Sequence, residues 1–301
     1  FAKIIYPMIP DGAINFVTGS GSVVGKSLIE SPDVDGIAFT GSREVGMKGF
    51  QEFTKSTTKP FISEMGGKNP AIVTKNTDLD KAADGVMNAA FGFGGQKCSA
   101  CSRVYVQNDV ADQFISKLVD KTKKLVIGMP WEKRVFLGPV INKDAKTKFE
   151  NAVSVAKKDG EILAGGKTLD ASGFENGYFV EPTIVAKLPE DHRLVKEELF
   201  LPFLCVQRYD SFDAALKLAN QSEYGLTAGV FTNDENQLEE FFSKIQAGVV
   251  YANRFASATT AALVSSQPFV GWKHSGSTGK GAGGENYLQQ FMKTQTQTRC
   301  D

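Results

Sequence analysis

The sequence has no excess of charge of either sign and no long apolar run. Its 34 basic and 34 acidic residues give a formal net charge of +0, so no overall field draws it to nucleic acid or to an anionic membrane. No apolar run approaches the ~18 residues that span a bilayer, and no basic and apolar leader precedes a cleavage site. We therefore expect no nucleic-acid partner and no membrane partner.

Cysteine and histidine are scarce. The four cysteines, Cys98, Cys101, Cys205 and Cys300, are too few and too scattered for a disulfide framework, which favours a reducing compartment. We expect a cytoplasmic protein, with the mitochondrial matrix as the other compartment of this kind. A zinc site is disfavoured because there is no second C-x-x-C pair and both histidines are isolated, so we assign no metal.

Short apolar runs alternate with amphipathic stretches, which is typical of a parallel sheet with crossover helices. The runs predict strands at 13–18, 36–40, 59–63, 71–74, 104–107 and near 205. The amphipathic stretches predict helices at 23–30, 44–54, 79–90, 110–125, 145–157 and up to 220. The tail from Asn286, rich in Thr and Gln, predicts one exposed strand able to pair with another subunit.

Two glycine-containing turns each precede a predicted helix. GSGSVVG at 19–25 would turn backbone N–H groups toward a pyrophosphate, or serve only as a tight turn. In FTGSREVG at 39–46, Gly41 permits close backbone approach and Ser42 can cap the helix and donate to a phosphate oxygen. An ordinary helix cap explains Ser42 equally well, so neither motif identifies a ligand by itself.

A carboxylate and a thiol stand out as chemically useful. Glu64 ends a predicted buried strand in EMGGKNP, and partial burial there raises a carboxyl pKa and makes a general base. Cys98 follows the glycine-rich loop of FGFGGQKCSACSR. Lys97 and a possible helix start both favour its thiolate. The alternatives are a solvated strand-end acid for Glu64, and an inert cysteine or a Cys98/Cys101 redox pair.

Taken together and in order, the motifs resemble the aldehyde dehydrogenase superfamily over nearly the whole chain. Glu64 precedes Cys98 by 34 positions, which matches the family spacing of base and nucleophile. The motifs are FTGSREVG, EMGGKN, GQKCSACSR, EELF at 197–200, YGLTAGVF at 224–231, Asn253 and QPFVGWKHSG at 267–276.

The resemblance implies an α/β fold of the aldehyde dehydrogenase type. Residues 1–66 would be the second half of a Rossmann-like NAD(P)-binding domain, 67–282 a catalytic domain with a parallel sheet, and 283–301 a tail that joins subunits of a homo-oligomer. Family members carry roughly one further domain before the position of Phe1. We therefore expect these 301 residues to fold poorly and to be inactive on their own.

The resemblance also implies site residues. The cofactor is NAD, with NADP left open, and its expected contacts are Gly21, Gly41 and Ser42 for the pyrophosphate, Val45 for adenine, Glu198 for the nicotinamide ribose and Phe200 for the nicotinamide. Cys98 would attack a small aldehyde and form a thiohemiacetal, and its N–H would supply part of an oxyanion hole. Hydride transfer would then leave a thioester, and Glu64 would activate the water that hydrolyses it.

Within the superfamily the chain is similar to 1-pyrroline-5-carboxylate dehydrogenases, which oxidise glutamate γ-semialdehyde to glutamate in proline catabolism. VTGSGSVVG, QKCSACSR and GAGGENYL carry this likeness. It implies that Ser99 and the turn Thr260-Ala261-Ala262 bind the substrate carboxylate, although Ala261 stands where the family pattern has Gly. Another semialdehyde or a hydroxyaldehyde is the alternative substrate. A non-catalytic homologue or a thiol-redox protein is the alternative of another class.

We predict that Cys98→Ser abolishes aldehyde oxidation whereas Cys101→Ser keeps substantial activity, because a hydroxyl is a far weaker nucleophile than a thiolate. Reduced-cofactor production by the complete polypeptide measures both variants. Equal loss in the two variants, together with a Cys98–Cys101 disulfide found by mass spectrometry, would favour the redox pair instead.

Overall fold

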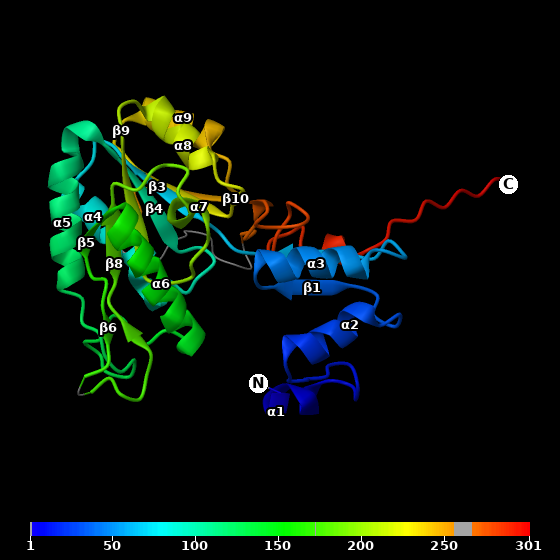
Figure 1. Cartoon of the computed structure of the whole chain (residues 1–301). Helices are drawn as coiled ribbons and strands as arrows, with labels where there is room; N and C mark the ends of the chain where they lie inside the picture. Colours follow the sequence, from blue (N-terminus) through cyan, green and yellow to red (C-terminus); the bar gives the residue numbers. More distant parts are fainter. Residues whose placement is uncertain (1, 172, 256–266) are drawn as a thin grey trace.

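The computed structural model describes residues 2–171, 173–255 and 267–301. Figure 1 shows a large α/β body, a smaller N-terminal part that contains β1 and α3, and a C-terminal tail that leads away from both. The helices are α1 (Ala2–Ile5), α2 (Lys26–Glu30), α3 (Arg43–Phe53), α4 (Leu79–Phe91), α5 (Ala111–Lys123), α6 (Lys143–Asp159), α7 (Arg193–Lys196), α8 (Phe212–Asn220) and α9 (Glu235–Lys244). Short helical turns are η1 (Tyr6–Met8), η2 (Gly21–Gly25), η3 (Gly92–Gly95), η4 (Asn108–Val110) and η5 (Leu288–Phe291).

A seven-stranded sheet in the order β12-β11-β3-β4-β9-β8-β5 forms the centre of the large body. Every neighbouring pair in it is parallel except β5 and β8. Strands β1 and β2 pair in parallel, whereas β10 with β13 and β6 with β7 are antiparallel. The strands are β1 (Ile37–Thr40), β2 (Phe61–Glu64), β3 (Asn69–Val73), β4 (Cys101–Gln107), β5 (Glu161–Ala164), β6 (Thr168–Leu169), β7 (Phe179–Val180), β8 (Thr183–Ala186), β9 (Phe203–Tyr209), β10 (Tyr224–Gly225), β11 (Thr227–Phe231), β12 (Val249–Ala252) and β13 (Trp272–Lys273). The predicted parallel α/β sheet is thus confirmed.

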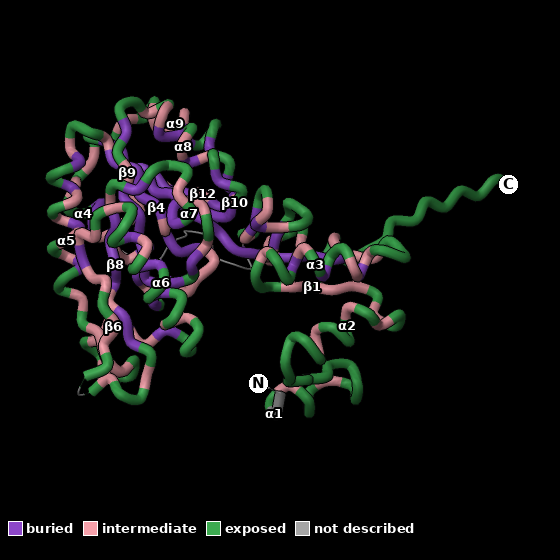
Figure 2. Tube along the Cα trace, viewed as in Figure 1, coloured by how far each residue is buried: buried purple, intermediate pink, exposed green. Residues whose placement is uncertain are grey.

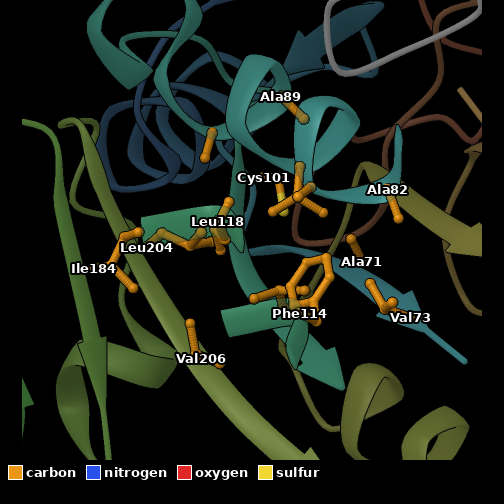
Figure 3. Packing of buried hydrophobic residues seen from close by; sticks show 14 of the residues in the cluster. Ala71, Val73, Ala82, Ala89, Cys101, Phe114, Leu118, Ile184, Leu204 and Val206 are labelled. Atoms are coloured by element: carbon orange, nitrogen blue, oxygen red, sulfur yellow. The ribbon is translucent and has the colours of Figure 1, made fainter. Parts of the chain in front are cut away.

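Alternate residues of the central strands face opposite sides of the sheet, as the two-residue repeat of a strand requires. On one side Ala71 and Val73 join a core built on α4 and α5 that includes Phe114 and Leu118 (Figure 3). On the other side Ile72 joins a core under α8 and α9. Helices therefore cover both faces, and the sheet is the most deeply buried part of the chain (Figure 2). Burial on both faces is what lets these strands be apolar throughout.

A buried arginine ties the start of β3 to its surroundings. Arg103 is 2% exposed. Its Nε donates to the Lys68 carbonyl at 2.9 Å and its Nη2 to the Ala219 carbonyl at 3.1 Å. Ala219 lies in the last turn of α8, where unpaired carbonyls and the helix dipole favour a cation. The Arg103 side chain therefore fixes the backbone at Lys68, immediately before β3, from the protein core.

The strand that the sequence predicts at 13–18 is wrong. Those residues are exposed and pair with none of the described strands, so their backbone groups lack the partners that a strand requires. The helix predicted at 23–30 starts earlier than expected. Its first helical turn, η2, begins at Gly21.

The tail follows η5 and carries no strand from Met292 to Asp301. A strand requires a partner, and none of the described residues pairs with this segment, so its pairing with a second subunit stays a prediction. Across the described ranges, none of the helices has the length and apolar character needed to cross a bilayer.

Candidate active site

Glu64 ends β2 beside the carboxyl end of β1, where open parallel sheets bind ligands. It pairs with Thr40 in the β1–β2 register, and Gly41 N–H donates to its carbonyl at 3.1 Å. On the other side it bridges to Gly276 of the late loop. The two predicted motifs at 39–46 and 64–70 are therefore neighbours, with Ser42 one residue beyond Gly41.

Gly66 and Gly67 let two other segments approach the Glu64 loop. A Cβ on Gly66 would lie 2.1 Å from Glu198 Oε2, and a Cβ on Gly67 would lie 2.6 Å from the Cys98 carbonyl oxygen. Gly67 N–H donates to Glu198 Oε1 at 2.9 Å. Any side chain at either position would push Glu198 or the Cys98 turn away.

Cys98 lies in a turn between η3 and β4. Ala100 N–H donates to the Lys97 carbonyl at 3.0 Å and closes the turn. Cys98 is half-buried, and Ser99 beside it is buried. Cys98 is therefore placed by a turn, and the helix start that the sequence predicted near it is wrong.

Burial controls the charge of the Glu64 carboxyl. The Glu64 carboxyl is half-buried and its Oε2 has no hydrogen-bond partner among the described residues. Burial raises the pKa of Glu64 from 4.5 to about 8, as expected where the charged form loses hydration without gaining a partner. Glu64 is therefore largely protonated at neutral pH, and it becomes a base as pH rises toward about 8.

The prediction that Lys97 and a helix start favour the Cys98 thiolate is wrong. Burial, followed by the Glu198 carboxylate, raises the pKa of the Cys98 thiol, and Glu64 adds to the rise. The backbone N–H groups of Ser99 and of Cys98 itself act in the opposite direction. Lys97 is half-buried, and burial lowers the pKa of its ammonium. A lysine that is itself poorly hydrated is a weak source of stabilisation for a neighbouring anion.

Cys101 has a different environment from Cys98. It begins β4, is 3% exposed, and its thiol donates to the Arg103 carbonyl at 3.4 Å. Burial raises the pKa of Cys101 to about 12, and both cysteines are free thiols. These features oppose thiolate exchange at Cys101. No cluster of three or more His, Cys, Asp or Glu side chains suited to a metal ion occurs within the described ranges.

The residues expected to contact a dinucleotide lie in three places. Gly41, Ser42 and Val45 are exposed at the start of α3, and Ser42 Oγ caps this helix by accepting from Val45 N–H at 3.4 Å. Glu198 and Phe200 lie on the loop after α7, beside Gly66 and Gly67. Gly21 lies in the separate turn η2 and is exposed.

Phe200 has an unusual backbone. Its φ is +60° and its ring is 45% exposed. An aromatic residue rarely adopts the left-handed region, and such strain concentrates at functional sites. A small cavity beside this loop is lined by Gly67, Lys97, Glu198 and Phe200 among others.

Two residues of the site were missed by sequence reasoning. Lys148 of α6 donates to the Glu198 carbonyl at 3.2 Å, and its ammonium opposes the rise in the Glu198 pKa that burial causes. No motif marks Lys148. Asn69 donates to the carbonyls of Cys98 and Ala100 at 2.8 and 3.0 Å. It stands inside the motif EMGGKN, which was the available signal. The expected carboxylate anchor Thr260-Ala261-Ala262 lies outside the described residues.

Comparison with known proteins identifies the family of this chain. Residues 1–297 match the aldehyde dehydrogenase family, and the chain belongs to that family. A 1-pyrroline-5-carboxylate dehydrogenase from Bacillus cytotoxicus is 42% identical over 293 residues, which cover 96% of this chain and 55% of the relative. The chain thus spans about half the length of such relatives.

Solved structures agree with the sequence comparison. A 1-pyrroline-5-carboxylate dehydrogenase from Thermus with bound NAD superposes with a TM-score of 0.86 at 37% identity, covering 94% of this chain and 54% of that one. Betaine aldehyde dehydrogenase from Staphylococcus aureus in complex with NAD+ superposes with a TM-score of 0.85 at 32% identity, covering 91% and 53%. The predicted fold class is confirmed.

We predict that Glu64→Gln makes the folded protein more resistant to heat, increasingly so as pH rises. The folded-state pKa is raised from 4.5 to about 8. The stability that the protonated carboxyl contributes is therefore fully present below the unfolded-state value and is lost as pH rises through about 8. Glutamine stays neutral and avoids this loss. Thermal unfolding of the complete polypeptide between about pH 5 and pH 9 measures the difference.

Glu150→Gln is the matched control, because Glu150 is an exposed carboxylate on α6. We expect its unfolding temperature to stay parallel to that of the unaltered protein across the same pH range. A Glu64→Gln curve that is also parallel would contradict the burial of an unpaired Glu64 carboxyl.

Proposed function

We propose that this chain carries the nucleophile and the base of an NAD-dependent aldehyde dehydrogenase that oxidises an aldehyde to a carboxylate. The observation that supports the proposal is the approach of Cys98 and Glu198 to the loop that follows Glu64. A Cβ on Gly67 would lie 2.6 Å from the Cys98 carbonyl oxygen, and a Cβ on Gly66 would lie 2.1 Å from Glu198 Oε2. A thiol and a half-buried carboxyl of pKa about 8 suit acyl transfer to water.

The residues at two of the three expected contact places fit a nicotinamide dinucleotide. The exposed N-terminus of α3 with Ser42 suits phosphate, and Val45, 52% exposed, offers an apolar surface to adenine. The Glu198 carboxylate suits ribose hydroxyls, and the exposed Phe200 ring suits a flat aromatic ring. A bound nicotinamide dinucleotide supplies the hydride acceptor. NADP remains open.

The chain's own residues perform the other steps. The Cys98 sulfur attacks the aldehyde carbon, and the Cys98 N–H helps to hold the oxygen that becomes negative. Once the adduct is oxidised, Cys98 carries the acyl group as a thioester. Glu64 accepts a proton from water, the water oxygen bonds to the thioester carbon, and the Cys98 thiolate leaves. Hydrolysis should therefore accelerate as pH rises toward about 8, where Glu64 loses its proton.

The substrate we propose is glutamate γ-semialdehyde, in equilibrium with 1-pyrroline-5-carboxylate, with Ser99 and the segment Thr260-Ala261-Ala262 as its carboxylate contacts. The relatives of that name, such as the one at 42% identity, support this choice. We further propose that residues 1–66 belong to the cofactor domain and 67–282 to the catalytic domain. The tail 283–301 would join copies of the protein in the cytoplasm.

We predict that Glu64→Gln slows steady turnover by about 10²- to 10⁴-fold while the first round of cofactor reduction survives, because an amide cannot accept a proton from water. Rapid mixing of the complete polypeptide with aldehyde and NAD should show a burst of one reduced cofactor per site followed by a slow phase. Loss of the burst itself would give Glu64 a role in the earlier step.

We predict that Ser99→Ala raises the KM for the semialdehyde by about tenfold and leaves a neutral aldehyde of equal length unaffected. A hydrogen bond to a carboxylate contributes about 1.5 to 3 kcal/mol. Initial rates with both aldehydes measure the ratio. An equal effect on the two would refute the carboxylate contact while leaving aldehyde oxidation intact.

A further inference from the structure

The turn that holds Cys98 is anchored through its carbonyl groups by two buried side chains. Asn69 Nδ2 donates to the carbonyls of Cys98 at 2.8 Å and Ala100 at 3.0 Å. Thr227 Oγ1 donates to the intervening carbonyl of Ser99 at 3.3 Å. Both residues are 2% exposed and each begins a strand, β3 and β11. The three successive carbonyls of the turn are thus bound by the central sheet.

Each of these carbonyls fixes a different N–H group. A peptide unit is planar and its C=O and N–H point in opposite directions. The Cys98 carbonyl belongs to the same unit as the Ser99 N–H, which contacts the Cys98 sulfur and favours its anionic form. The Ser99 carbonyl belongs to the unit of the Ala100 N–H, which donates to the Lys97 carbonyl and closes the turn.

Of the two anchors, only Asn69 bonds to the carbonyl of the peptide unit that carries the Ser99 N–H. We propose that Asn69 is a positioning residue for the nucleophile, and that its bond to the Cys98 carbonyl aims the Ser99 N–H at the Cys98 sulfur. This inference rests on the proposed function only in taking Cys98 as the nucleophile. Asn69 does not touch the reacting atoms. It acts through the orientation of one peptide unit.

The chemistry of the asparagine side chain suits this role. Its amide nitrogen supplies the two donors that the carbonyls of Cys98 and Ala100 require, and its Oδ1 accepts from Thr227 N–H at 3.0 Å. A carboxylate could not donate, and an alkyl group would leave all three backbone groups unpaired. Gly67 makes room, because a Cβ there would lie 2.5 Å from Asn69 Oδ1. Both the nitrogen and the oxygen of the Asn69 amide therefore form hydrogen bonds at this turn.

The test is the pH dependence of Cys98 alkylation by iodoacetamide, followed by mass spectrometry of the Cys98 peptide in the complete polypeptide. In Asn69→Ala the Ser99 N–H is no longer held toward the sulfur. We expect the pH midpoint to rise and the rate at pH 7 to fall about three- to tenfold, with rates converging at high pH. Cys300, which is exposed, reports the reagent in the same sample and should not change.

Thr227→Val is the matched control. It removes a buried hydrogen bond from the same turn but leaves the Cys98 carbonyl bound, so its alkylation rate should stay within about twofold of the original. Circular dichroism shows whether the Asn69 variants are folded. If Asn69→Ala unfolds, the same alkylation measurement is made on Asn69→Ser, whose side chain is neutral and has a single donor. An unchanged midpoint in the folded Asn69 variant, or an equal shift in Thr227→Val, would overturn the proposal.

Alkylation needs neither aldehyde nor cofactor, so this result stands apart from the proposed activity. A polypeptide that alkylates as expected yet oxidises no aldehyde would refute the proposed function alone. In an active protein, Asn69→Ser should lower kcat at neutral pH, recover part of it at higher pH, and leave KM within about twofold.

Discussion

The close approach of backbone at Gly66 and Gly67 is the constraint on which the site depends. The segment after β2 lies directly against the Glu198 carboxylate and the carbonyl of Cys98, at separations that no Cβ could share. Two stretches of chain, the loop that carries Glu198 and the turn that carries Cys98, therefore converge on one short loop. The Arg103 guanidinium supports that loop from the core side by binding the Lys68 carbonyl. The two glycines are needed for packing as much as for flexibility.

Convergence of this kind has an electrostatic cost. Burial raises the pKa of Glu64, of Glu198 and of the Cys98 thiol together, because the charged form of each group loses hydration. Lys148 and the Gly67 N–H partly offset this for Glu198. The raised pKa of Cys98 therefore favours its thiol form. A half-buried carboxyl and a half-buried thiol lower the stability of the fold when they are charged. Shifted pKa values of this kind are common among residues of active sites.

Much of the architecture could be predicted from periodicity and turn residues. The apolar runs of β3 and β4 and the capped helix at Ser42 follow local rules that leave a clear pattern. The run at 13–18 has the same local pattern, but a strand forms only where a partner exists, and that information is not local. The left-handed backbone of Phe200 and the contact of Lys148 with Glu198 also arise from packing between distant segments. The role of Asn69 follows only once β3 and the Cys98 turn are side by side.

The contrast between Cys98 and Cys101 shows how position along the fold selects one thiol. The two residues differ by three positions, yet Cys98 lies in the turn whereas Cys101 is the first residue of β4 and pairs with Asn69. As part of the sheet, Cys101 is buried in the core formed with α4 and α5, and its thiol donates to the Arg103 carbonyl. The turn instead leaves Cys98 half-buried, with N–H groups at its sulfur. The different burial and hydrogen bonding of the two thiols therefore follow from where the strand begins.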